Sequence, residues 1–221
     1  TEPYTIMGQS QPAKSETVVT WIGDEATRVD NPDGTSTIVI YADQKAYILK
    51  HSERAYAEMP LGMDKIMDEM AAEAGKDEED KTTAAAMRGM MGAMMQFKVS
   101  VAETGEEKKI GGWNARKYIM TTTTPMGTST SEIWATEDLE ADLSGYRKAA
   151  NINMAGQEGF AEMTAEMEKI RGVTVRTVNR SQMMGAEVTS TEELVEFASK
   201  PAPKGSFEMP AGYRKASMFG E

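Results

Sequence analysis

The chain lacks cysteine altogether and has a single histidine among its 221 residues. Disulfides and thiol catalysis are therefore excluded, and a metal site built from several Cys and His ligands cannot form. The histidine, His51, lies in an alternating stretch next to Ser52 and Glu53, where we expect a surface or edge residue. No nucleophile motif and no outstanding carboxylate pair accompanies it. The chain is therefore predicted not to be an enzyme and to need no cofactor or metal.

Long apolar runs and basic patches are also missing. The longest weakly polar run, residues 83–97, contains Arg88 and falls short of the roughly 18 apolar residues that a membrane-spanning helix needs. Lys and Arg number 24 against 35 Asp and Glu, which gives a net charge of −11, and they form no run. This balance disfavours nucleic acid and anionic membrane surfaces as partners.

Methionine, by contrast, is abundant: the chain has 19, and nine of them fall between Met59 and Met95. Segments 61–74 and 83–95 repeat Met at helical spacing and contain one Leu and one Ile between them. A well-defined core prefers Leu, Ile and Val, whereas Met is common on adaptable binding surfaces. We therefore predict a site for a hydrophobic ligand, such as a lipid or acyl chain, lined by Met63, Ile66, Met67, Met70, Met87, Met90, Met91, Met94 and Met95.

Two other interpretations of these methionines remain open. The stripes have the spacing of ordinary core packing, in which case the protein is a structural or interaction module without a small-molecule ligand. Thioether sulfur is also a soft ligand for Cu(I), and the cluster Met87–Met95 has the spacing of a Cu(I) site if three sulfurs converge.

The rest of the chain has the two-residue period of β-strands, interrupted by tight turns such as Asn31-Pro32-Asp33-Gly34. Strands are predicted over residues 4–9, 16–22, 26–29, 35–41, 45–51, 54–59, 96–101, 113–124, 128–136, 173–179 and 188–197, with a turn at 103–108. Helices are predicted over 61–74, 83–95 and 157–170, and a further helix is expected to start at 136–138. Short strands with tight turns favour antiparallel pairing and an α+β fold. Trp21, Trp113 and Trp134 are expected to anchor the core of the sheet.

Several stretches resemble the LolA/LolB-like superfamily of envelope lipoprotein carriers, and most closely its uncharacterised branch of unknown function. They are Thr20-Trp21-Ile22-Gly23, Arg28-Val29-Asp30, Lys45 to Leu49, Ile110 to Tyr118, Glu132 to Thr136 and the closing strand Phe207 to Tyr213. The resemblance implies one domain over residues 1–221, with a strongly curved antiparallel β-sheet, an incomplete barrel, whose concave face is covered by amphipathic helices.

The resemblance also implies a function. Carrier members of the superfamily hold lipoprotein acyl chains between sheet and helices and bring no catalytic residues. We therefore expect an exported protein of the periplasm or cell surface, with another envelope protein as an additional partner. Because residue 1 is Thr rather than Met, we also expect that an N-terminal segment has been removed.

Overall fold

The computed structural model describes residues 1–6, 9–62, 65–66, 97–125, 127–140, 160–183 and 186–216. These residues are mostly β-strand, and their strands form three sheets, none of them a closed barrel. The chain divides into two compact units. The first unit comprises Thr1–Ser15, Met87–Ala141 and Gln157–Ala198, and the second comprises Glu16–Ala86, Asp142–Gly156 and Ser199–Glu221. The prediction of one LolA-like domain over the whole chain stays a prediction.

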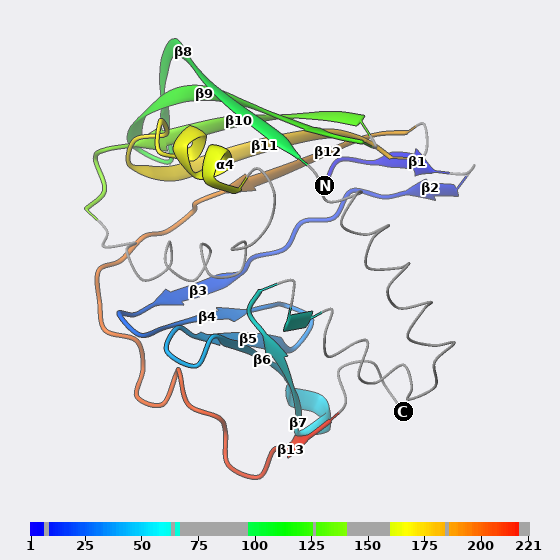
Figure 1. The fold of residues 1–221 in the computed structure, drawn as a ribbon, viewed down its shortest axis with the longest axis vertical. Coiled ribbons are helices and arrows are strands. Elements are labelled where there is room, and N and C mark those ends of the chain that lie inside the picture. Colours follow the sequence, from blue (N-terminus) through cyan, green and yellow to red (C-terminus); the bar gives the residue numbers. More distant parts are fainter. Residues whose placement is uncertain are drawn as a thin grey trace. The chain divides into compact units, whose positions relative to one another are not determined.

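The second unit contains a six-stranded sheet in the order β13-β7-β6-β5-β4-β3 (Figure 1). Its strands are β3 (Val19–Ile22), β4 (Ala26–Asp30), β5 (Thr35–Ile40), β6 (Lys45–Lys50), β7 (Ala55–Pro60) and β13 (Arg214–Lys215), with the 3-10 helix η1 (His51–Glu53) between β6 and β7. Strands β3 to β7 form an antiparallel meander, and β13 pairs in parallel with β7. Gly34 adopts a φ of 80° in the predicted turn between β4 and β5, which a side chain would disfavour.

The first unit contains a five-stranded antiparallel sheet in the order β12-β11-β10-β9-β8. Its strands are β8 (Lys98–Ile110), β9 (Trp113–Thr124), β10 (Gly127–Thr136), β11 (Val173–Met183) and β12 (Ala186–Glu193). The short hairpin of β1 (Tyr4–Ile6) and β2 (Gln9–Gln11) lies beside β12, where the Glu2 amide donates a hydrogen bond to the Thr189 carbonyl over 3.0 Å. Gly111 and Gly112, with φ values of 58° and 99°, form the two-residue turn between β8 and β9.

Helix α4 (Phe160–Met167) packs against β8 in the first unit. The apolar cluster on that side of the sheet consists of Val101, Tyr118, Ile133 and Ala135, and Ile170, just after the helix, packs against it. The Glu166 carboxylate accepts a hydrogen bond from the Val101 amide over 2.6 Å. This bond caps a backbone donor on the outer edge of β8, an edge that would otherwise be open to another strand.

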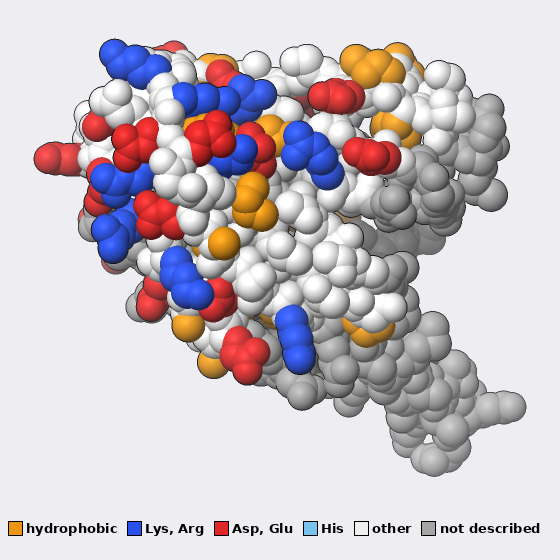
Figure 2. Space-filling model, turned by 90° about the horizontal axis from the view of Figure 1, so that it is seen from above, with side chains coloured by type: hydrophobic (Ala, Val, Ile, Leu, Met, Phe, Trp, Pro, Cys, Tyr) orange, Lys and Arg blue, Asp and Glu red, His pale blue; other side chains and the backbone are white. Residues whose placement is uncertain are grey.

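The charges of the first unit lie around Trp134, whose side chain is 1% exposed. Lys108 and Lys117 place their ammonium groups 4.1 and 5.5 Å from the centre of a Trp134 ring. Lys117 also binds Glu132 and Glu106 at 3.1 and 3.0 Å. In the view of Figure 2, basic and acidic side chains are interleaved in this way over part of the surface. The Trp134 ring is thus covered in part by Lys108 and by Lys117, which is paired with two glutamates.

Most of the predicted strands are confirmed, and the antiparallel pairing with them. The expected single curved sheet is not: β7 pairs with β13, and β8 belongs to a separate five-stranded sheet. The turn predicted at 103–108 is a bulge within β8, which continues to Ile110. Residues 137–140 are not helical, and the closing stretch Phe207 to Tyr213 consists of turns that precede β13.

Candidate functional site

The predicted ligand-binding methionines lie outside the described residues. This holds for Met63, Met67, Met70, Met87, Met90, Met91, Met94 and Met95. Of the predicted set only Ile66 is described: it is half-buried and helical, and its amide donates to the Gly62 carbonyl over 3.2 Å. The predicted site would be built on the six-stranded sheet, whose strand β7 leads into the Met-rich segment.

One face of that sheet carries a single charged residue in β3 to β7, Lys50 at the last position of β6. Thr35, Lys50 and Ala55 form one end of this face. The rest of it, here called the uncharged face, consists of Thr20, Ile22, Thr27, Val29, Thr37, Val39, Ala46, Ile48, Ala57 and Met59. Thr27 and Ala46 are buried, Thr20 and Ile22 are exposed, and the other six are partly exposed. A sheet face open to solvent normally carries polar and charged side chains, so an uncharged and incompletely buried face indicates an apolar contact.

The opposite face contains the core of the second unit and is called the core face. Ile38 and Leu49 are 1% and 0% exposed there. The C-terminal segment 199–216 crosses this face: a Cβ atom at position 23 would lie 3.0 Å from the Phe207 ring, so Gly23 allows Phe207 to pack closely. The largest buried side chains of the second unit thus lie on the core face, whereas the other face buries the small side chains of Thr27, Ala46 and Ala55.

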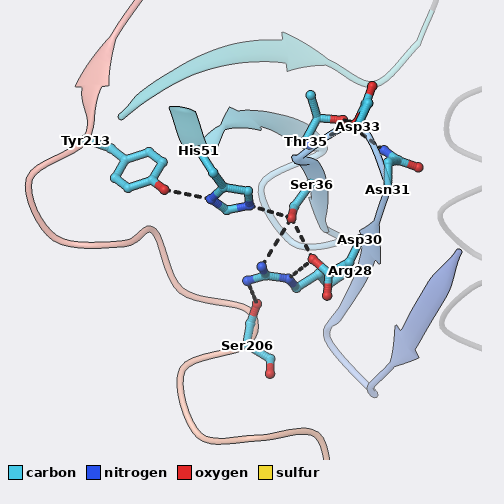
Figure 3. Close-up of polar contacts among 9 residues, drawn as sticks. All are labelled: Arg28, Asp30, Asn31, Asp33, Thr35, Ser36, His51, Ser206 and Tyr213. Atoms are coloured by element: carbon cyan, nitrogen blue, oxygen red, sulfur yellow. Dashed lines mark hydrogen bonds and ion pairs between the residues drawn. The ribbon is translucent and has the colours of Figure 1, made fainter. Parts of the chain in front are cut away.

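Six residues join the core face to the C-terminal segment in one polar cluster (Figure 3). The polar cluster consists of Arg28, Asp30, Ser36, His51, Ser206 and Tyr213. Arg28 Nε donates to Asp30 Oδ1 over 2.6 Å, and Arg28 Nη1 donates to the Ser206 carbonyl over 3.1 Å. The guanidinium thus binds a neighbouring residue of its own strand and the C-terminal segment at once, which its fork of donors permits.

Ser36 stands at the centre of the polar cluster and is 1% exposed. Its hydroxyl donates to Asp30 Oδ1 over 2.6 Å and accepts from Arg28 Nη2 over 3.2 Å. Its oxygen also lies 2.7 Å from His51 Nε2, while His51 Nδ1 lies 2.6 Å from the Tyr213 hydroxyl. One proton assignment satisfies every bond: Tyr213 donates to Nδ1, and Nε2–H donates to Ser36.

The charge of Asp30 is maintained by this arrangement. Burial raises the pKa of Asp30, but hydrogen bonds from Ser36 and Arg28 and the charge of Arg28 outweigh that effect, so the pKa falls below its ordinary value of 3.8. The Asp30 carboxylate therefore stays ionised beside the guanidinium at neutral pH.

The distance between Ser36 and His51 is that of a catalytic Ser–His pair, but the hydrogen-bond partners of the two residues differ from those in a catalytic triad. In a serine-hydrolase triad the acid orients the histidine, and the serine is free to attack a substrate. Here Asp30 contacts Ser36 rather than His51, His51 faces a tyrosine hydroxyl, and Ser36 is buried. The arrangement is suited to fastening the C-terminal segment to the sheet.

A small cavity lined by polar and charged side chains lies in the first unit. It has a volume of about 160 Å³ and is lined by Glu107, Asn114, Ala115, Arg116, Ala135, Glu137, Asp138 and Arg171. Arg116 binds Glu107 and Glu137 at 3.1 and 3.2 Å, so its main charges compensate one another. Pockets for ligands of drug size measure roughly 300–1,000 Å³ and are mostly apolar, which this cavity is not.

No group of three His, Asp or Glu side chains in the described ranges could hold a metal ion. None of the helices described here combines the length and the apolar character required to cross a bilayer.

Sequence reasoning missed the polar cluster. His51 was expected at the surface or an edge, but it is half-buried and both ring nitrogens are bound. Two motifs that resemble the LolA/LolB-like superfamily contained members of the polar cluster: Arg28 and Asp30 belong to the first, and Tyr213 belongs to the closing stretch. Of the three tryptophans, Trp134 is confirmed as a core residue, Trp113 packs against the same cluster, and Trp21 is partly buried.

Comparison with known proteins places the chain in a family. The family model described as "Domain of unknown function (DUF4412)" matches residues 7–213. The chain belongs to the DUF4412 family. The matched range of the family ends at Tyr213 and so includes all six members of the polar cluster. No curated protein and no solved structure matches the chain.

Proposed function

We propose that this DUF4412 protein is a non-enzymatic, exported binding protein for a hydrophobic ligand, a lipid or an acyl chain. In this proposal the ligand lies between the uncharged face and amphipathic helices formed by the Met-rich segments 61–74 and 83–95. The fold would then be a variant of the LolA/LolB-like architecture, with another envelope protein as donor or acceptor of the ligand.

The observation that carries the proposal is the uncharged face itself. More than a quarter of the chain is charged, yet these ten residues include no charged side chain, Lys50 lies only at the end of the face, and eight of the ten keep some exposure. Strand β7, which ends the meander, leads directly into the segment with the greatest density of Met. Each buried Å² of acyl chain would contribute about 25 cal/mol before the cost of ordering it.

Native mass spectrometry of freshly purified protein, followed by titration with a fluorescent fatty acid, tests the proposal. We expect a co-purified adduct of lipid mass and saturable binding of the probe. Val39→Glu, which places a charge on the uncharged face, should abolish binding, whereas Thr128→Glu on the first unit's sheet should not. If Val39→Glu is folded by circular dichroism and binds the probe as the parent does, the proposal is wrong.

Replacement of the methionines separates this proposal from Cu(I) binding. Met90→Leu with Met94→Leu keeps the surface apolar and should preserve fatty-acid binding, while Met90→Glu with Met94→Glu should abolish it. A Cu(I) site would behave differently, because leucine has no sulfur and the first pair of substitutions would already remove the metal. Stoichiometric Cu(I) in the parent that is lost in the leucine variant would establish the alternative.

A further inference from the structure

Strand β3 is the last strand of the six-stranded sheet, and within the described ranges no strand pairs with its outer side. Its register toward β4 is fixed by the bond from the Gly23 amide to the Ala26 carbonyl, 2.9 Å long. Because hydrogen-bonded pairs alternate in an antiparallel ladder, Val19 and Trp21 direct their backbone groups toward β4. Thr20 and Ile22 therefore direct their N–H and C=O groups outward.

The two edges of this sheet differ in their side chains. The opposite edge is formed by β13, which has only the two residues Arg214 and Lys215, both charged and exposed. Short, charged edge strands are a common protection against unwanted pairing. Strand β3 has neither charge nor proline, and Val19 and Ile22 are 47% and 41% exposed. It thus has the composition of a strand that accepts a partner.

We propose that β3 binds an extended segment of another protein as an additional antiparallel strand. Backbone hydrogen bonds would form with Thr20 and Ile22, and alternate apolar side chains of the partner would extend the two faces of the sheet. Asp24 and Glu25 directly follow β3 and are both exposed, so the partner strand has basic residues at the end that faces them.

Charge also decides between a foreign strand and a second copy of this chain. Each copy carries a net charge of −11 and would bring a further Asp24 and Glu25 to the interface. Self-association is therefore opposed at low ionic strength, whereas a basic strand is attracted. This inference rests on the outward backbone groups of Thr20 and Ile22, whereas the proposed function rests on the side chains of the uncharged face, so either can fail without the other.

Thr20→Pro tests whether the outer edge of β3 binds a strand, and it leaves the hydrogen bonds between β3 and β4 intact. Proline removes the outward N–H of residue 20, and edge strands tolerate it where that group faces solvent. Thr20→Val is the matched control, since it changes the side chain and keeps the N–H. Both variants should retain the circular dichroism spectrum of the parent, which identifies any loss of folding.

The probe is a labelled peptide of alternating Thr and Val with two lysines at one end, and its counterpart has two glutamates instead. We expect the lysine peptide to bind the parent and Thr20→Val, with at least about tenfold weaker binding to Thr20→Pro. Hydrogen exchange should show new protection at the amides of Thr20 and Ile22. Equal binding by folded Thr20→Pro, or no binding by the parent, would overturn the edge as a site.

The charge of the partner is tested by the same peptides. Equal affinity for the glutamate peptide would reject a basic strand as the partner. Sedimentation of the protein alone distinguishes the second copy: a dimer that forms in the parent and disappears in Thr20→Pro would show that β3 pairs with itself, which contradicts the proposal.

Discussion

The first unit carries its charges on the outside of a sheet, whereas the second unit places its polar residues beneath a crossing segment. In the first, Lys117, Glu132 and Lys108 surround the buried ring of Trp134. In the second, Arg28 and His51 lie under residues 199–216 and bind Ser206 and Tyr213. The comparison teaches that the two sheets differ in their second side: the first covers the Trp134 ring with charged side chains, whereas the second has the uncharged face, on which only small side chains are buried.

The largest expected effect concerns the core of the first unit. Trp134→Ala should lower the free energy of unfolding by about 3–5 kcal/mol, because it leaves a cavity beneath the lysines and removes their aromatic support. Urea unfolding measures the loss, and hydrogen exchange shows whether β3 to β7 lose protection with it. Thr128→Ala, on an exposed part of the same sheet, is the control. Equal loss of protection in both units would show that the two sheets unfold as one.

Two glycines of the first unit provide a sharper test of close packing. Gly172 and Gly105 both have positive φ values, 84° and 75°. A Cβ at position 172 would lie 2.0 Å from the Thr136 carbonyl oxygen, whereas a Cβ at 105 would have no atom within 4 Å. Gly172→Ala should therefore cost about 3 kcal/mol and Gly105→Ala about 1 kcal/mol, the cost of the left-handed backbone alone. Similar unfolding midpoints for the two variants would contradict the packing described here.

The polar cluster of the second unit is probed by Ser36→Ala. The substitution removes the shared partner of Asp30, Arg28 and His51 in a buried position, and should cost about 1–3 kcal/mol in chemical denaturation. Limited proteolysis should then cut residues 199–216 earlier than in the parent. Ser52→Ala, at an exposed neighbouring site, should change neither measurement. A stable Ser36→Ala variant with a protected C-terminal segment would show that the polar cluster does not fasten it.

The polar cluster also shows where prediction from sequence ends. Strands β4 to β7 and β9 follow from alternation and turn residues, which are local properties of the chain. The contact between His51 and Tyr213 joins positions 162 residues apart, and no periodicity reports such a pairing. The same holds for the pairing of β13 with β7: the two residues Arg214 and Lys215 have no strand signal of their own, yet they determine where the sheet ends. The spacing of the Met residues predicts apolar helix faces, but it does not predict which other parts of the chain those faces contact.

Acid should weaken both units, through different carboxylates. A hydrogen bond from Trp134 lowers the pKa of Glu132, burial raises it less, and Lys117 lowers it further, so it falls below its ordinary value of 4.5. The pKa of Asp30 is lowered as well, despite its burial. A lowered pKa in the folded state adds stability above the unfolded pKa, and this stability is lost as the pH falls through the folded value.

Stability measured from about pH 7 down to about pH 3 should therefore fall less steeply in Glu132→Gln and Asp30→Asn than in the parent. Hydrogen exchange assigns each effect: Glu132→Gln should change the acid response of β9 and β10, and Asp30→Asn that of β4 and β5. An unchanged acid slope in either variant would mean that its carboxylate has the same pKa in the folded and unfolded chain.

The smallest expected effect is a difference in stability between substitutions of Lys108, which contacts Trp134, and of its neighbour Lys109. The Lys108 ammonium lies 4.1 Å from the centre of the Trp134 ring, and Lys109, the next residue on β8, points to the other side of the strand. Lys108→Met should cost about 0.5–1 kcal/mol, the usual value of a cation–π contact at an exposed site. Lys109→Met removes the same charge without that contact, so thermal unfolding should show little change. If both variants lose the same stability, the loss comes from net charge, and the lysines of the first unit contribute only by keeping its open face soluble.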